Sequence, residues 1–309
     1  MEKISFLQIL NYSAVIVLFL GLLSKAIKYF TMPINLRWEL YPIPHEKGRP
    51  HGGSYFEDLN WWTKPREKTL IGQLKFMIPE ILFIKALYHD NRKLWIFSFP
   101  FHFGLYLYIG GFILLLIGSV LTSYINLSSD LFIIKIVQSL AIIFFGIGFI
   151  LGIFGSIGLL IRRSTSEELE GFTSPKDFFN LIFILLIMAS GLISLILYDK
   201  GLIAARVYIN GLITFNPIVS PNPMFIIHIV LLSLFLIYFP FTHMTHMFAK
   251  YLMWDKIKWE DEPNLKGSAI EARVDKALGY VQDWSAPHIH TGTKWSETAT
   301  KGVEENEKK

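Results

Sequence analysis

The segment at residues 223–250 constrains the fold of this chain more than any other part. It reads PMFIIHIVLLSLFLIYFPFTHMTHMFAK and contains no acidic or basic side chain, histidine aside, before Lys250. An α-helix rises about 1.5 Å per residue, so the run is long enough to cross a hydrocarbon core about 30 Å thick. The segment is therefore predicted to be a transmembrane helix.

Three histidines lie in this segment, at His228, His243 and His246. His228 and His246 are separated by about five full turns at about 3.6 residues per turn, so both imidazoles are predicted to project from one helix face. One would lie near each edge of the membrane. An imidazole is costly to place in a membrane and usually has a function there. The segment is interpreted as a scaffold for redox metal sites.

The composition indicates a multi-span helical membrane protein surrounded by lipid, with no nucleic-acid partner expected. Of the 309 residues, 52% are hydrophobic and 17% are charged, and the mean hydropathy is +0.42. The absence of cysteine excludes a disulfide, a thiolate-held iron–sulfur cluster and a covalent c-type haem within this chain. Metal chemistry must therefore use histidine, methionine or carboxylate ligands, and any iron–sulfur centre must come from another subunit.

The predicted fold is all-α: a five-helix membrane bundle in residues 1–254, followed by a tail at residues 255–309. The N-terminal apolar run is interpreted as a span and not as a signal peptide, because it is long, lacks a strongly basic start and ends in lysines. The predicted spans are residues 7–30, 94–120, 131–161, 178–197 and 224–250.

The lysine and arginine distribution predicts the orientation. The loop at residues 31–92, the loop after the third span and the start of the tail are basic, and basic loops stay in the cytoplasm. The N-terminus is thus predicted outside and the C-terminus inside. Within the first loop, Trp61 and Trp62 are expected to anchor at the interface, and residues 68–87 to lie along it as an amphipathic segment.

The tail is predicted to dock a partner subunit. Its first part places apolar residues at helical intervals, and its second part is aromatic and mixed in charge. A tail that packs on the protein's own surface is the alternative. The apolar positions are Ile270, Val274, Leu278 and Val281, and the aromatic part contains Trp284 and Trp295.

His102 and His246 form the strongest candidate pair. With the predicted topology, His102 lies about 12 Å into the second span from the cytoplasmic side, and His246 lies at a comparable depth in the fifth. Two imidazoles at matched depth on different helices can ligate one haem iron axially, which suits electron transfer. The alternative is that each histidine is buried alone and hydrogen-bonded to a neighbour. His243 is either the true ligand, a haem propionate partner or a group that handles quinone protons.

His228 is interpreted either as a ligand of a second haem near the outer edge or as a quinone contact. A second haem would need a second ligand. Ten residues beyond His102 stands Phe112, so the second span offers no histidine there. Met188, an outer-loop residue or a five-coordinate haem would have to complete the site. Otherwise, His228 forms a hydrogen bond to quinone.

Five glycines in the third span predict close helix packing, with room for a flat cofactor as the alternative. The remaining histidines are expected at the surface, and without cysteines they indicate no zinc site. The glycines are Gly146, Gly148, Gly152, Gly155 and Gly158, and the histidines are His45, His51, His89, His288 and His290.

The histidine segments resemble the gamma subunits of respiratory nitrate reductases. His228 and His246 show the H-x17-H spacing of the family's last span, including the FPF before the final turns, and Phe101-His102-Phe103-Gly104 is similar to its F-H-x-G. The resemblance implies a five-span cytochrome b with two haems and the N-terminus outside. In that family a second histidine follows His102 ten residues on, where this chain has Phe112, so the resemblance supports the His102/His246 pair and not the outer pair.

The loop contains LRWELYPIPHEKG and GGSYFEDLNWWTKPRE, and the tail contains WSAPHIHTGTKW. These segments resemble the membrane cytochromes b of the Tmc-, Hme- and Dsr-type complexes of sulfate reducers, which are related to heterodisulfide reductase. This resemblance implies a subunit of the prokaryotic cell membrane with one or two haems b. It would pass electrons between menaquinone, or a periplasmic multihaem cytochrome c, and a cytoplasmic heterodisulfide-reductase-like iron–sulfur subunit. The alternatives are a transporter, which would need intramembrane charges and repeats that the sequence lacks, or a membrane anchor without a cofactor.

Overall fold

A computed structural model describes most of the chain: residues 5–31, 59–60, 63–65, 67, 69–171, 173–216, 222–246, 264–286 and 289–306. The chain forms two compact units. The first contains Met1–Leu22 and Phe76–Met244, and the second contains Leu23–Lys75 and Thr245–Lys309. The predicted Trp61 and Trp62 anchors lie outside the described residues.

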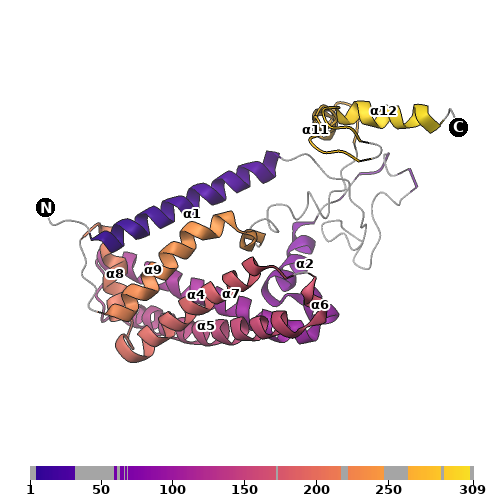
Figure 1. The fold of residues 1–309 in the computed structure, drawn as a ribbon. Helices are drawn as coiled ribbons and strands as arrows, with labels where there is room; N and C mark the ends of the chain where they lie inside the picture. The colour runs from indigo at the N-terminus through magenta and orange to yellow at the C-terminus, as the bar shows by residue number, and fades with distance from the viewer. Residues whose placement is uncertain are drawn as a thin grey trace. The chain divides into compact units, whose positions relative to one another are not determined.

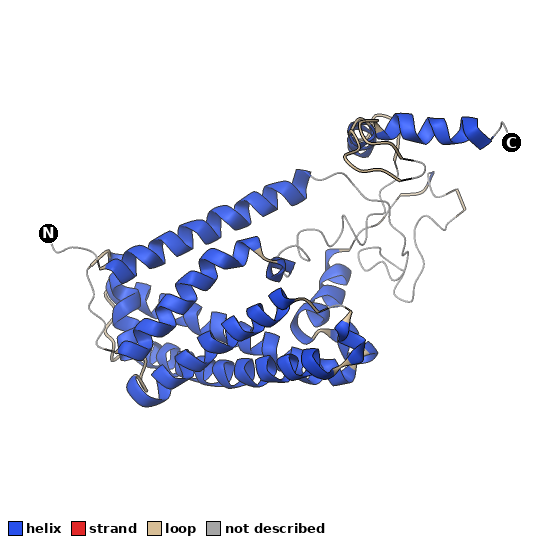
Figure 2. Cartoon of the chain, viewed as in Figure 1, coloured by secondary structure: helices blue, strands red, loops and turns tan. Residues whose placement is uncertain are grey.

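The described residues form helices and no strand, with only isolated backbone bridges in the tail (Figures 1 and 2). Five helices are long and apolar enough to cross a membrane, so the predicted all-α fold with five candidate spans is confirmed. The spanning helices are α1 (Phe6–Thr31), α4 (Arg92–Ser123), α5 (Phe132–Thr165), α7 (Pro175–Ile193) extended by the π-helical turn η3 (Ser194–Tyr198), and α9 (Pro223–Tyr238) extended by the 3₁₀ turn η4 (Phe239–Phe241). The other helices are α2 (Leu70–Phe83), α3 (Lys85–Asp90), α6 (Glu167–Glu170), α8 (Ile203–Thr214), the 3₁₀ turn η5 (His243–Thr245), α11 (Ala269–Leu278) and α12 (Trp295–Asn306).

The fifth span is broken, which corrects one prediction. Its α-helix ends at Tyr238, a 3₁₀ turn carries Pro240, and Thr242 has extended backbone (φ −108°, ψ 169°) before η5 begins. Proline lacks the amide hydrogen that continues a helix, and its ring clashes with the carbonyl four residues earlier. The prediction of one continuous helix over residues 224–250, with His228 and His246 on one face, is therefore wrong. Residues 247–250 lie outside the described part.

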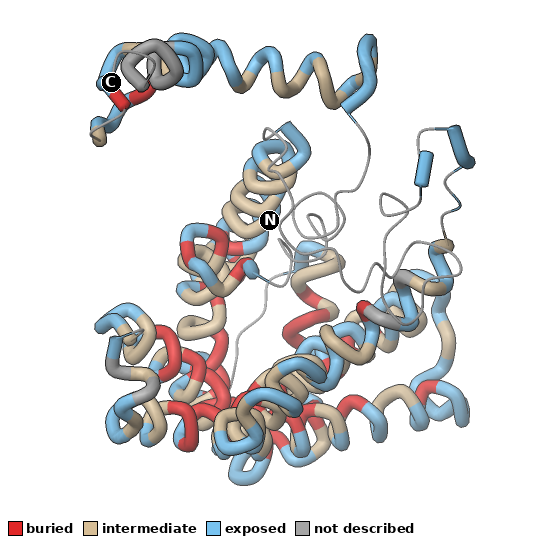
Figure 3. The backbone as a smooth tube through the Cα atoms, turned by 90° about the vertical axis from the view of Figure 1, so that its right-hand side faces the viewer, coloured by how far each residue is buried: buried red, intermediate tan, exposed pale blue. Residues whose placement is uncertain are grey.

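The spanning helices of the first unit pack in the order α4, α5, α7 and α9, and α8 lies against α4. The buried residues gather on the helix faces that look toward one another (Figure 3). The core is almost wholly aliphatic and aromatic, and its outward-facing side chains are also apolar, as expected for helices surrounded by lipid.

Glycines bring α4 and α5 into backbone contact. A Cβ atom added to Gly104 would lie 2.5 Å from the Gly152 nitrogen and 2.8 Å from the Gly148 carbonyl oxygen. A Cβ atom on Gly155 would lie 2.5 Å from the Phe101 backbone nitrogen. Close approach through small residues is the usual way in which membrane helices associate. The packing interpretation is thus supported for Gly148, Gly152, Gly155 and Gly158, which have protein atoms beside them, but not for Gly146, where an added Cβ atom would meet nothing within 4 Å.

Polar side chains fasten the first turns of α1 to its neighbours. Gln8 is fully buried, and its Nε2 donates to the Asn216 carbonyl at 2.7 Å. The Asn11 amide donates to Ser233 Oγ on α9 at 3.0 Å. The Tyr12 hydroxyl donates to the Leu212 carbonyl on α8 at 2.8 Å. These bonds satisfy groups that lipid could not, and they hold α1 to the bundle.

Helix α8 lies in a segment that the sequence pattern placed in a link between spans. Its start is fixed by Asp199, which is buried and accepts hydrogen bonds from the Ile203 amide at 2.6 Å and the Ala205 amide at 3.1 Å. A carboxylate at a helix N-terminus satisfies amides that have no partner inside the helix. The helix is too short to cross a membrane, so the five-span topology is unaffected.

In the second unit, the predicted amphipathic tail helix is confirmed as α11, capped by Ser268. It ends at Leu278, so Val281 lies beyond it in a short antiparallel bridge with Lys294. Helix α12 then follows, and the Trp284 and Trp295 rings meet edge to face at 6.2 Å. The second tail helix was not predicted.

The α4–α5 contact makes a prediction with a matched control. We expect Gly104→Ala to lower the Tm of the detergent-solubilised protein, because the new methyl group overlaps backbone atoms and overpacking costs about 1–3 kcal/mol. Gly146→Ala, on α5 with nothing within 4 Å of its added Cβ, should leave the Tm unchanged or slightly raised. Equal effects of the two changes in a thermal unfolding assay would contradict this packing.

Candidate functional site

His102 on α4 has one ring nitrogen held by the backbone of its own helix. Its Nδ1 atom lies 2.7 Å from the carbonyl oxygen of Ser98, one turn earlier. Because a carbonyl only accepts, Nδ1 must carry the proton, and the lone pair of the neutral ring is then on Nε2. Metal-ligating histidines commonly hold their second nitrogen in this way. The side chain is only partly buried, in contact with Phe101 edge to face at 5.2 Å.

His246 is the last described residue before residue 264, and its side chain is exposed. It follows η5, where Thr245 is buried and accepts a hydrogen bond from Lys25 Nζ of α1 at 2.7 Å. This bond attaches the turn that precedes His246 to the end of the first span. His102 belongs to the first unit and His246 to the second, so their pairing at one iron stays a prediction.

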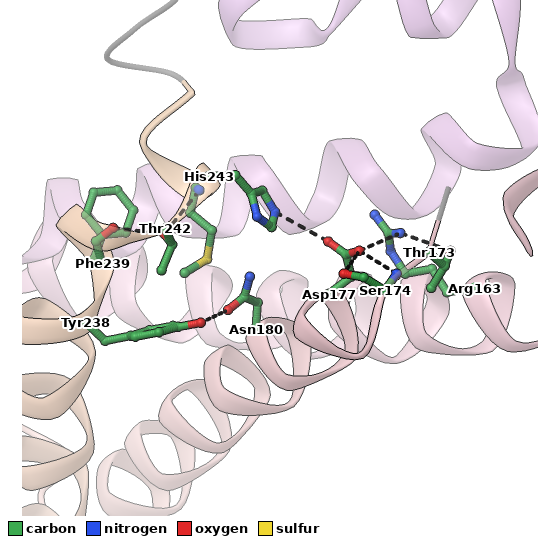
Figure 4. Close-up of polar contacts among 10 residues, drawn as sticks. Arg163, Thr173, Ser174, Asp177, Asn180, Tyr238, Phe239, Thr242 and His243 are labelled. Carbon is green, nitrogen blue, oxygen red and sulfur yellow. Dashed lines mark hydrogen bonds and ion pairs between the residues drawn. The ribbon is translucent and has the colours of Figure 1, made fainter. Parts of the chain in front are cut away.

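His243 does not stand with His246 on a helix face, because it begins the 3₁₀ turn η5. Its Nε2 atom lies 3.4 Å from Asp177 Oδ1 at the start of α7, and the ring is more than half exposed (Figure 4). The other Asp177 oxygen accepts from the Ser174 amide at 2.9 Å and lies 3.9 Å from Arg163 of α5. Asp177, His243 and Arg163 therefore form a charged cluster, which we call the Asp177 cluster.

One helical turn below this cluster, Asn180 is buried, and only one end of its amide is satisfied. Its Oδ1 accepts from the Tyr238 hydroxyl of α9 at 2.9 Å (Figure 4). Its Nδ2 has no hydrogen-bond partner among the described residues. A buried donor without a partner is costly and calls for an explanation, such as a ligand that supplies the acceptor.

His228 lies far from these groups along α9, near its first turns. It is 7% exposed and contacts Tyr108 of α4 and Ser190 of α7. The other residues considered for an outer haem do not meet it in a ligand arrangement. Met188 is buried with its sulfur beside Gly152, and Phe112 is 38% exposed.

Of the remaining histidines, the two that the structure describes lie at the surface, as expected. His89 and His290 are exposed, while His45, His51 and His288 lie outside the described residues. Across the described part of the chain, no three histidine, aspartate or glutamate side chains gather as a metal cluster.

Sequence analysis missed the partners of its histidines. The capping box Ser174-x-x-Asp177 was visible as a helix start, but nothing in the sequence linked its carboxylate to His243. Tyr108 and Asn180 carried no signal at all, because a single tyrosine or asparagine in an apolar run matches no motif.

One comparison with known proteins identifies the family of the chain. The family model described as the nitrate reductase gamma subunit matches residues 86–258, which is more than half of the chain and includes all four candidate histidines. No curated protein matches the chain. With five candidate spans and this match, the protein is a multi-pass membrane protein. The chain belongs to the nitrate reductase gamma subunit family and is a membrane b-type cytochrome subunit of a respiratory complex.

Proposed function

We propose that this subunit carries electrons between menaquinone, or a periplasmic cytochrome c, and a cytoplasmic heterodisulfide-reductase-like iron–sulfur subunit. The observation that carries the proposal is which nitrogen of the His102 ring carries the proton. Its Nδ1 proton is held by the Ser98 carbonyl, within a span that the family model matches, and its Nε2 lone pair is suited to a metal.

His102 and His246 are the residues that we propose would hold one haem b. When bound, haem b supplies reversible one-electron transfer at its iron. The donor set fits this group, because both side chains are imidazoles and the chain has no cysteine for covalent attachment. The Ser98 carbonyl orients the first ligand, and the Lys25–Thr245 hydrogen bond fixes the backbone next to the second.

Asn180 and the Asp177 cluster are the proposed contacts of the quinone head group. The Asn180 Nδ2 donor, which lacks a partner among the described residues, would donate to a quinone carbonyl oxygen. Oxidation of a quinol to a quinone releases two electrons and two protons. The Asp177 carboxylate and the His243 imidazole, 3.4 Å apart, offer the groups that accept those protons and pass them on. His243 is exposed, which suits exchange with solvent.

The tail is the proposed docking element for the iron–sulfur subunit. Its compact fold of α11, the short bridge and α12 exposes Leu278, Tyr280, Trp284 and Trp295, each about 40% exposed or more. Exposed aromatic residues are typical of partner-binding surfaces.

Haem content tests the ligand assignment. We expect purified His102→Ala and His246→Ala variants to lose the low-spin haem spectrum, because each removes one axial imidazole, while His89→Ala of the exposed α3 surface keeps it. The measurement is a pyridine haemochrome assay against protein concentration. A pigment-free wild-type protein, or full haem in both ligand variants, would show that the assignment is wrong.

Quinol kinetics test the Asn180 contact. Asn180→Leu removes the amide donor with little change in volume, so we expect it to raise the KM for a menaquinol analogue about tenfold while haem content stays the same. Tyr238→Phe is the matched control, since it removes the hydroxyl that bonds Asn180 Oδ1 and leaves Nδ2 in place. Asp177→Asn should lower kcat for quinol-dependent haem reduction. If the KM of Asn180→Leu equals that of Tyr238→Phe, Asn180 does not bind the quinone.

Deletion of residues 264–309 tests the docking element. The deletion removes α11 and α12 but none of the proposed ligands, so we expect haem content to be retained and the iron–sulfur subunit to be lost on co-purification. A variant in which Leu265, before α11, is changed to Ser serves as the control with the tail fold intact. Retention of the partner after the deletion would place its binding surface elsewhere.

A further inference from the structure

His228 is enclosed by three helices of the first unit. It lies on α9, whose start is capped by Asn222, and its ring contacts residues of α4 and α7. The residue is 7% exposed. A histidine that binds a cofactor needs one ring nitrogen directed at that cofactor, so the partners of the two nitrogens decide what His228 can do.

The Nδ1 atom of His228 is a donor. It lies 3.0 Å from the Ile187 carbonyl oxygen and 3.2 Å from Ser190 Oγ, both on α7. Because the carbonyl only accepts, Nδ1 carries the proton and Nε2 has the lone pair of the neutral ring. This half of the arrangement is the same as at His102, where Nδ1 is held by the Ser98 carbonyl.

The Nε2 atom, which a metal would need, already has a partner. The Tyr108 hydroxyl of α4 lies 3.1 Å from it and must be the donor, because Nε2 has no proton. A metal–imidazole bond is about 2 Å long and takes up the same lone pair. Iron at this nitrogen would therefore have to displace the Tyr108 hydroxyl.

Tyr108 is held in place by aromatic packing. Its ring meets Phe145 edge to face at 5.4 Å and lies 5.5 Å from Phe149, and these two rings stack at 5.7 Å. Phe145 and Phe149 are almost fully buried. Phe149 also meets the His228 ring edge to face at 5.9 Å. Protein side chains thus cover this face of the imidazole, and a flat macrocycle has no room there.

The α7 side of the ring is closed as well. A Cβ atom added to Gly191 would lie 2.9 Å from His228 Cε1 and would overlap the Phe149 ring. The glycine is therefore needed for the imidazole and the phenyl ring to pack here, and it leaves no space for a cofactor.

Neither residue considered as a second ligand of an outer haem, at position 112 or at Met188, contacts His228 through a metal-binding atom. The family resemblance expects a second-span histidine at position 112, where this chain has Phe112, which is 38% exposed. Tyr108, one turn earlier on α4, contacts His228 in its place. Met188 packs against Gly152 of α5, with its Sδ 3.2 Å from a Cβ atom added there.

We infer that the outer position does not bind haem and is a closed structural junction, in which Tyr108, His228 and Ser190 tie α4, α9 and α7 together. The inference rests on the proposed function and deepens it: the subunit holds a single haem, at His102 and His246. The subunit then does not pass electrons across the membrane, so of the two proposed redox partners outside the cytoplasm the inference keeps menaquinone and excludes the periplasmic cytochrome c.

The experiment measures haem per chain on the purified full-length protein by pyridine haemochrome, together with the optical spectrum and the Tm. We expect a single haem per chain in the wild type. His228→Gln should keep that ratio and spectrum and lower the Tm by a few degrees, because it removes a buried hydrogen-bonded ring. Tyr108→Phe should also keep the ratio and lower the Tm less.

The Phe112→His variant provides a second test. It leaves the buried junction unchanged, because the Phe112 side chain is partly exposed. It restores the histidine that the family pattern expects. If the junction is closed, the haem ratio stays at one in this variant. A second haem gained by Phe112→His would overturn the inference.

The outcomes separate the inference from the function it rests on. Two haems in the wild type that fall to one in His228→Gln would overturn the inference and leave the cytochrome function intact. No haem in the wild type would overturn the proposed function itself. A single haem that is lost in His228→Gln but retained in His102→Ala would overturn the inference by placing the haem at the outer position.

Discussion

The backbone contact between α4 and α5 at Gly104 and Gly152 is the constraint on which the rest of the first unit depends. It fixes how close the two helices lie, with atoms of one backbone meeting atoms of the other. His102 stands two residues before this contact, and Tyr108 stands one turn after it. The contact between the two helices therefore positions both the candidate ligand His102 and Tyr108, which bonds His228.

The same kind of hydrogen bond, from an imidazole Nδ1 to a backbone carbonyl, occurs at His102 and at His228. At His102 and at His228 a main-chain carbonyl holds Nδ1, which leaves the lone pair on Nε2. At His228 the Tyr108 hydroxyl donates to that lone pair. Tyr108, one turn before position 112, thereby links α4 to α9 through the His228 ring.

The sequence predicted the features that depend on composition along one segment. Span number and the tail helix follow from apolar length and periodicity, and the close-packing role of the glycines follows from residue size. Pro240 inside the fifth span is a sequence signal for the break, although the apolar run around it continues on both sides. The pairs His243–Asp177 and His228–Tyr108 could not be predicted, because they join residues that are distant in sequence and depend on how the helices face one another.

The break after Tyr238 divides the fifth span into the α9 helix and a following stretch of 3₁₀ turns. The α9 helix is anchored through His228 and Ser233, while Pro240 packs on Gly21 and Thr242 turns the chain into extended backbone. A rotation at Thr242 changes the direction of the His243–His246 stretch without moving the helix before it. His228 and His243 thus belong to segments whose directions are set separately, so a change in the backbone at one histidine need not alter the other.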